Sequence, residues 1–171
     1  MNPPPSGPGF RRRAYANPLQ FLRDLGQLAS RIGTVLALSL PGGISAGFRE
    51  RLMLVVTAVN RCRHCAYGHE IMARRAGLSG AEIAALLALD LAHCPEHELP
   101  ALRHAIHFAE CDGQASPEAM ALLEATYGAA TARQIDTACL LIQAGNRVGN
   151  TWDLLLSRLS RGRLGLLPEE R

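Results

Sequence analysis

The chain contains no lysine, and all 18 of its basic residues are arginine. This absence excludes Schiff-base chemistry, which needs a lysine amine, and the P-loop, whose lysine contacts nucleotide phosphates. Aromatic residues make up only 5% of the chain, and the net charge of +3 comes from scattered arginines. That combination gives little support for nucleic-acid binding, so we expect no nucleic-acid partner.

Long apolar runs are missing as well. No segment approaches the ~20 consecutive apolar residues that a membrane-spanning helix needs. The N-terminal sequence MNPPPSGPGFRRR lacks the apolar core of a signal peptide. The five cysteines are odd in number and unevenly spaced, which is not the pattern of a disulfide framework. We therefore expect a cytoplasmic protein without a membrane partner.

Strand-like alternation is also absent, and the apolar residues recur at helical spacing from Pro18 onward. The pattern predicts an all-α fold. A first helical segment runs from Pro18 until Pro41-Gly42-Gly43, and a capping box of Ser79 and Glu82 precedes a later helix. The further helices are expected over residues 46–59, 62–76, 83–91, 99–109, 117–128 and 131–159.

The length predicts a single domain with flanking tails. Residues 1–14 are rich in proline, glycine and arginine, which is typical of a disordered N-terminal tail. The compact helical domain is expected over residues 15–160, and residues 161–171 form a C-terminal tail.

Two cysteines, two histidines and one carboxylate gather in residues 50–69, namely Glu50, Cys62, His64, Cys65 and His69. On a helix, the Cys-x-x-Cys spacing brings the two Cα atoms within the ~4.4–6.8 Å that a disulfide needs. Cys62, Cys65 and His69 fall at about 0°, 300° and 340° on the helical wheel, which is one narrow stripe. Asn60 and Arg61 lie between two apolar runs. We therefore expect a turn there, with both cysteines in the first turn of the new helix, where the helix dipole stabilises a thiolate.

The position of Glu50 on the preceding helix predicts its partner. With a turn at residue 61 and a rise of about 1.5 Å per residue, Glu50 lies roughly 16 Å from the turn, His69 roughly 12 Å and Cys65 roughly 6 Å. Glu50 can therefore reach His69 but not the thiol, as in a relay where a carboxylate orients an imidazole that accepts the nucleophile's proton. His64, near 200° on the wheel, points away from the stripe. A solvated Glu50 and a surface His64 are the alternatives.

Other interpretations of the cysteines stay open. The pair could be small buried hydrophobes, or Cys62, Cys65 and His69 could bind zinc with Glu50 or His64 as the fourth ligand. A second group comprises His93, Cys94, His97, His104, His107 and Cys111. His93 to His97 lie in a proline-containing connector, so a solvated or core role is favoured for this group. Cys139, with apolar neighbours, is predicted to lie in the core.

The five residues at these spacings, followed by the A-G-L-S-x-x-E-I of residues 76–83, resemble the AhpD-like branch of the carboxymuconolactone decarboxylase superfamily. The resemblance covers about residues 18–155. It implies an all-helical fold, assembly as a homotrimer or hexamer, and reduction of hydroperoxides through a disulfide cycle. It further implies that Cys65 attacks the peroxide, that Cys62 resolves the sulfenic acid, and that His69, Glu50 and His64 form the proton relay.

The implied cycle needs a hydroperoxide substrate and an external dithiol reductant, with no bound cofactor and no metal. The decarboxylases proper of the same superfamily perform lyase chemistry and do not carry the cysteine pair. The alternatives to a peroxidase are a non-catalytic helical oligomer that senses redox state or holds zinc, and a lyase of the decarboxylase type.

Overall fold

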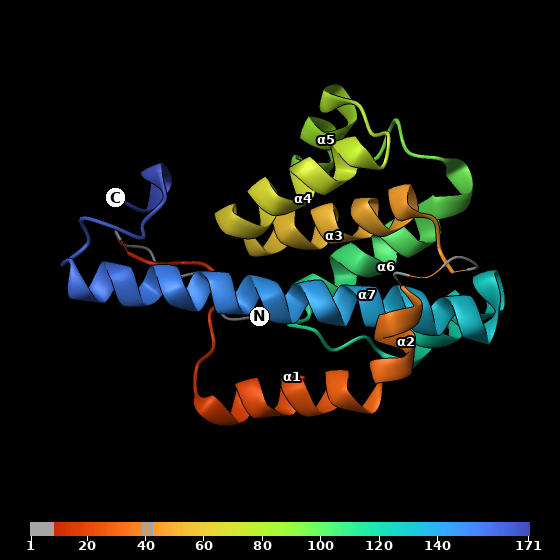
Figure 1. Ribbon diagram of the computed structural model, residues 1–171, viewed down its shortest axis with the longest axis horizontal. Helices are drawn as coiled ribbons and strands as arrows, with labels where there is room; N and C mark the ends of the chain where they lie inside the picture. Colours follow the sequence, from red (N-terminus) through yellow and green to blue (C-terminus); the bar gives the residue numbers. More distant parts are fainter. Residues whose placement is uncertain (1–8, 39, 41–42) are drawn as a thin grey trace.

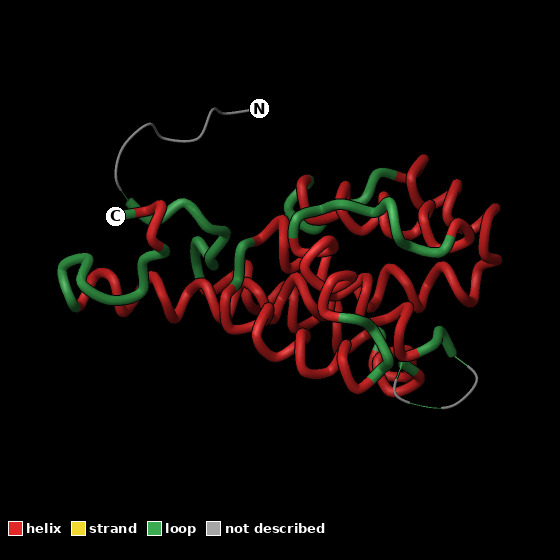
Figure 2. Tube along the Cα trace, turned by 90° about the horizontal axis from the view of Figure 1, so that it is seen from above, coloured by secondary structure: helices red, strands yellow, loops and turns green. Residues whose placement is uncertain are grey.

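The computed structural model describes residues 9–38, 40 and 43–171, and this part of the chain contains helices and loops but no strand (Figures 1 and 2). The expected all-α fold is therefore confirmed. The α-helices are α1 (Pro18–Ser30), α2 (Ile32–Ala37), α3 (Ala46–Asn60), α4 (Arg63–Arg75), α5 (Gly80–Leu87), α6 (Leu99–Glu110) and α7 (Pro117–Leu159). Short 3-10 turns cover Glu96–Glu98 and Pro168–Glu170.

Helix α7 runs the length of the molecule and separates two groups of helices (Figure 1). Helices α3 to α6 lie on one side of it, and α1 lies on the other. The middle of helix α3 is apolar and buried around its circumference, since the five consecutive residues Leu52 to Val56 are at most 4% exposed. A helix segment that is apolar on every side must be enclosed by others, so this part of α3 forms the centre of the core between α4, α5, α6 and α7.

Polar side chains fix the register of α3 against α7. Gln143, Asn146 and Asn150 lie at helical spacing on one face of α7, and all three are fully buried. The amide of Asn60 donates to Gln143 at 2.6 Å, and Thr57 donates to Asn146 at 3.2 Å. Because buried polar groups lose free energy when they are unpaired, sliding α3 along α7 would break both contacts.

Several helix boundaries differ from the sequence expectation. The segment that begins at Pro18 is divided at Arg31, which has φ −110° and separates α1 from α2. The expected capping box is half formed: Ser79 accepts from the backbone N–H of Glu82, but the Glu82 carboxylate pairs with Arg51 at 2.7 Å. Helix α5 runs from Gly80 to Leu87, whereas the sequence predicted a helix over residues 83–91.

Gly128 was expected to separate two helices, and it forms a kink inside α7 with φ 77° and ψ 154°. A positive φ of this size is readily adopted by glycine because it has no Cβ. The chain resumes its helical path directly after the kink and continues to Leu159.

The two ends of the chain meet beside α7. Residues 1–8 of the expected tail lie outside the described residues, but Arg12 is 6% exposed and its guanidinium contacts both Asp153 and Glu170. The C-terminal segment folds back, so that the 3-10 turn Pro168–Glu170 supplies one of these partners. Figure 1 shows this segment in dark blue near the end of α7.

The described residues contain no helix that is long and apolar enough to cross a membrane.

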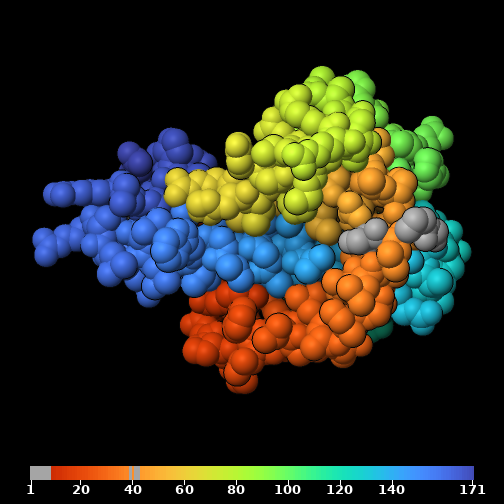
Figure 3. Space-filling model, in the orientation of Figure 1, coloured from red at the N-terminus to blue at the C-terminus, as the bar shows by residue number. Residues whose placement is uncertain are grey.

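Helix α1 buries a charged residue and exposes apolar ones, the reverse of an ordinary surface helix. Its one buried residue is Asp24, whereas Phe21, Leu22 and Leu25 are 41–58% exposed. Phe21 lines a groove between α1 and α7 together with Trp152, which is 57% exposed. In Figure 3, α1 lies along α7, whose C-terminal end extends past it. An exposed apolar surface of this kind is typical of a protein contact.

The expected homo-oligomer would bury this surface, and substituting one leucine tests it. Leu22→Arg should convert an assembly into single chains of 18.4 kDa, because a charge at an apolar interface is costly to desolvate. Light scattering at micromolar concentration measures the change. Leu122→Arg is the control, since Leu122 is 67% exposed but lies on the N-terminal part of α7. A wild-type monomer, or equal masses for wild type and Leu22→Arg, would contradict the prediction.

Candidate functional site

The site begins at the sharp turn between α3 and α4. Arg61 adopts a left-handed conformation with φ 55° and ψ 38°, and Cys62 then caps α4. The carbonyl of Asn60 accepts a hydrogen bond from the Asn150 amide at 2.9 Å, which holds the turn against α7. The turn therefore lies at the residue expected from the sequence, with the two cysteines at the N-terminus of the new helix.

The two thiols are in direct contact. The Sγ atoms of Cys62 and Cys65 are 2.7 Å apart, and the backbone N–H of Cys65 donates to the Cys62 sulfur at 3.3 Å. Cys62 is 1% exposed, whereas Cys65 is partly exposed, and both are free thiols. A small molecule arriving from solvent would therefore reach Cys65 first.

The backbone of α7 closes the site behind the sulfurs. A methyl group at Gly149 would lie 2.7 Å from the Cys62 Sγ and 3.8 Å from the Cys65 Sγ. Only glycine lets the helix approach the sulfur this closely. Gly149 is thus a site residue that sequence reasoning missed, and a glycine inside a long predicted helix is the signal that could have found it.

The pKa values of the two thiols move in opposite directions. The hydrogen bond with Cys65 lowers the pKa of Cys62 to about 7, against the opposing effect of burial, and the charge of His64 also lowers it. The same hydrogen bond, followed by burial, raises the pKa of Cys65. The pair therefore releases one proton near neutral pH and shares the remaining one.

Glu50 and His69 form the pair expected from their positions. The Oε2 atom of Glu50 lies 2.7 Å from Nδ1 of His69. Glu50 is 1% exposed and is also contacted by Arg49 at 3.3 Å, so the alternative of a solvated Glu50 is wrong. A carboxylate at Nδ1 keeps the proton there and directs Nε2 away from it.

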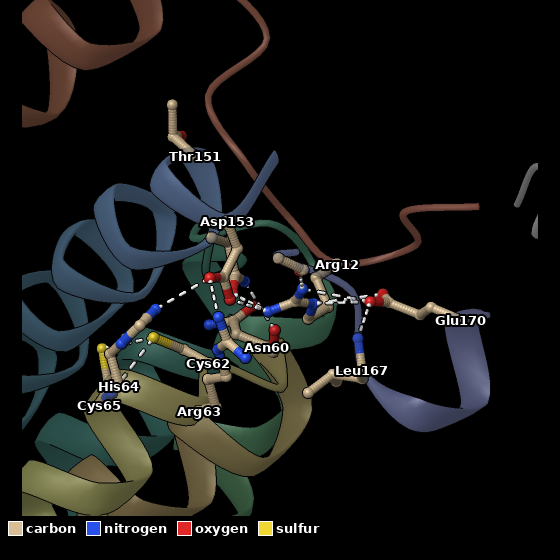
Figure 4. A network of polar contacts seen from close by, with 12 residues as sticks. Arg12, Asn60, Cys62, Arg63, His64, Cys65, Thr151, Asp153, Leu167 and Glu170 are labelled. Atoms are coloured by element: carbon tan, nitrogen blue, oxygen red, sulfur yellow. Dashed lines mark hydrogen bonds and ion pairs between the residues drawn. The ribbon is translucent and has the colours of Figure 1, made fainter. Parts of the chain in front are cut away.

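His64 is not part of the Glu50–His69 pair and contacts a different carboxylate. Its Nε2 atom is 3.0 Å from Oδ1 of Asp153, and its side chain is 45% exposed. The structure thus brings together Glu50 with His69 and Cys62 with Cys65. It pairs His64 with Asp153, a residue of α7 that the sequence did not single out (Figure 4). Asp153 directly precedes the apolar run Leu154 to Leu156, and this position is the sequence signal that could have indicated a buried, paired carboxylate.

The second histidine and cysteine group does not form one cluster. His104 is buried with Nε2 3.7 Å from Asp136, and exposed Cys111 contacts His107 at 3.7 Å. Cys139 is fully buried, as expected. Among the described residues, no three His, Cys, Asp or Glu side chains are arranged to hold a metal ion.

Comparison with known proteins identifies the family. A model described as the carboxymuconolactone decarboxylase family matches residues 24–110, which is half of the chain and includes the cysteine pair. The chain therefore belongs to this family, in agreement with the superfamily that the motif resembles. No curated protein and no solved structure matches the chain.

The close approach of α7 to the thiols makes a prediction. Gly149→Ala should displace the Cys62 side chain, because the new methyl group would overlap its sulfur. We expect formation of the Cys62–Cys65 disulfide to slow about 10-fold to 100-fold, as misplaced reacting groups do. The rate of thiol loss with diamide as oxidant measures this.

Gly145→Ala is the matched control. Gly145 lies one turn earlier on α7, and a methyl group there would meet nothing within 4 Å. That variant should oxidise at the wild-type rate and gain up to about 1 kcal/mol of helix stability. Equal oxidation rates for the two variants would mean that Gly149 does not shape the site.

Proposed function

We propose that this member of the carboxymuconolactone decarboxylase family is a thiol-dependent peroxidase of the AhpD-like kind, which reduces hydroperoxides through a Cys62–Cys65 disulfide. The observation that carries the proposal is the 2.7 Å contact between the two sulfurs at a helix N-terminus, beside a buried carboxylate–imidazole pair. The substrate is a hydroperoxide, and an external dithiol restores the thiols.

The proposed cycle has three steps. The Cys65 thiolate attacks the terminal oxygen of the hydroperoxide, the O–O bond breaks, and the leaving alkoxide takes a proton and departs as an alcohol. The Cys62 thiol then displaces hydroxide from the Cys65 sulfenic acid, which forms the disulfide and releases water. The external dithiol reduces that disulfide by two successive exchange reactions and is itself oxidised.

Access and charge favour different sulfurs for the attack. Cys65 is the more exposed thiol, whereas the lowered pKa belongs to Cys62. Because the sulfurs share one proton across a hydrogen bond, moving it from Cys65 to Cys62 carries the negative charge to the accessible atom. We assign the attack to Cys65 on this ground and the resolving role to Cys62.

Glu50 and His69 supply the proton transfers in this proposal. Glu50 is buried, so its carboxylate is held against Nδ1 of His69 rather than solvated. His69 follows Cys65 by one helical turn on the same face of α4. Because Nδ1 contacts Glu50, Nε2 is the ring nitrogen that can exchange a proton with the site. A group in this position can accept the thiol proton and return it to the leaving alkoxide.

Substitution of the two cysteines separates their roles. Cys65→Ser should abolish peroxide consumption, whereas Cys62→Ser should allow one turnover and leave a sulfenic acid that dimedone traps. Stopped-flow peroxide consumption and mass spectrometry measure the two outcomes. The reverse pattern would assign the attack to Cys62, in line with its lower pKa, and full activity in both variants would exclude the cycle.

The relay makes a separate prediction. Glu50→Gln should slow peroxide consumption by about 10²–10⁴-fold, the range of a general-base contribution, and His69→Gln should be at least as damaging. The double variant should be no slower than His69→Gln alone, because groups that act as a unit are not additive. The rate against pH, with dithiothreitol as reductant, measures this. Wild-type activity and an unchanged pH profile in Glu50→Gln would contradict the relay.

The same assays separate the remaining alternatives. A redox sensor would form the disulfide without catalytic peroxide turnover, and a zinc-holding protein would carry zinc and lose it together with the cysteines. A decarboxylase-type lyase would keep its activity in Cys65→Ser.

A further inference from the structure

Asp153, a buried carboxylate on α7, contacts His64, which lies two residues after Cys62 (Figure 4). The side chain of Asp153 has no exposed surface. Its Oδ1 atom accepts from His64 Nε2 at 3.0 Å and from Arg63 at 2.6 Å, and its Oδ2 atom accepts from Arg12 at 2.6 Å. Asp153 therefore joins the N-terminal segment, α4 and α7 at one point.

Arg12 keeps this carboxylate ionised inside the protein. Burial alone would raise the pKa of Asp153, but the hydrogen bonds from Arg12, His64 and Arg63 outweigh it and lower that pKa. Arg12 is itself held in place, because Glu170 accepts from its Nε atom at 3.2 Å and the carbonyl of Gly165 accepts from its Nη2 atom. Both ends of the chain thus stabilise one buried anion.

The anion fixes the orientation of His64. Because Nε2 donates to Asp153, the neutral ring has its acceptor at Nδ1. The ring lies near the thiols, since a methyl group at Gly149 would meet both Cys62 Sγ at 2.7 Å and His64 Cδ2 at 3.7 Å.

We infer that Asp153, held by Arg12, is a positioning residue that fixes the His64 imidazole beside Cys62, a role that rests on the thiol chemistry proposed above. The consequence concerns thiolate formation, because a positively charged His64 favours the charged form of Cys62. Asp153 acts on the sulfur through His64 and touches neither thiol.

Other charged groups surround the cysteine pair and have to be considered in any pH-dependent test. Arg61, Arg63 and Glu169 line a pocket together with Cys62. Glu50 pairs with His69, one helical turn beyond Cys65, and Arg12 pairs with Asp153. Arg61 pairs with Glu169, and Arg63 pairs with Asp153. Within the described part of the chain, Asp153 is the one carboxylate that hydrogen-bonds to His64.

Asp153→Asn tests this role, since it keeps the shape of the side chain and removes its charge. The readout is the rate at which iodoacetamide alkylates the cysteine pair, measured against pH without any peroxide. We expect the midpoint to move to higher pH and the rate at neutral pH to fall about threefold to tenfold, because the His64 ring is no longer held where its charge lowers the pKa of Cys62. His64→Gln should give the same shift, and the double variant should move no further.

Asp136→Asn is the matched control. Asp136 is also a buried carboxylate of α7 paired with an arginine, Arg31, and a histidine, His104. It lies 13 residues before Gly149, or about 20 Å along the helix. This variant should lose stability but keep the wild-type alkylation profile.

Three results would overturn the inference: an unchanged profile in Asp153→Asn, a shift to lower pH, or a further shift in the double variant. If Asp153→Asn does not fold, nitrogen NMR of the histidines in the wild-type protein decides instead. The neutral His64 ring should carry its proton on Nε2, and a proton on Nδ1 would reject the role. Neither readout involves peroxide, so loss of this inference is distinguishable from loss of the proposed peroxidase activity.

Discussion

The site depends on the buried polar register between α3 and α7. Gln143, Asn146 and Asn150 hold Thr57 and Asn60 at fixed heights along α7. The chain can then turn at Arg61 and start α4 with Cys62 directly against Gly149. An apolar interface would tolerate small shifts of one helix along the other, whereas these hydrogen bonds favour one register. The contact between the sulfurs follows from that register, because Cys62 and Cys65 are then enclosed between two rigid helices.

The charges around the thiols are organised as two carboxylate–imidazole pairs with different locations. Glu50 and His69 join α3 to α4, and Asp153 and His64 join α7 to α4. The two histidines are five residues apart on α4, so their side chains leave the helix about 140° apart. In our account the first pair moves protons and the second sets the charge next to Cys62. Because the two histidines point in different directions, the side chain of His69 is largely buried at 17% exposure, whereas that of His64 remains 45% exposed.

Local spacing predicted much of this arrangement. The helical pattern, the turn at residue 61 and the reach of Glu50 to His69 all follow from distances along one or two adjacent helices. The contacts of Arg12 with Asp153 and Glu170 could not be predicted from local spacing. Arg12 is 141 residues from Asp153 and 158 residues from Glu170 in the sequence. Arg12 also lies in a segment whose composition is typical of disorder. Its buried ion pairs with Asp153 and Glu170 hold the segment around it against the rest of the fold. The outward apolar face of α1 was missed because helical spacing does not reveal which face is covered.

The central claim is that peroxide oxidises Cys62 and Cys65 together. The most direct test measures the intact mass and the number of free thiols before and after the addition of one equivalent of peroxide. Our account predicts a loss of two hydrogens and a fall from five free thiols to three, with alkylation and peptide mapping locating both lost thiols at Cys62 and Cys65. An unchanged thiol count, or a product that gains oxygen at one cysteine and keeps the other thiol free, would contradict it.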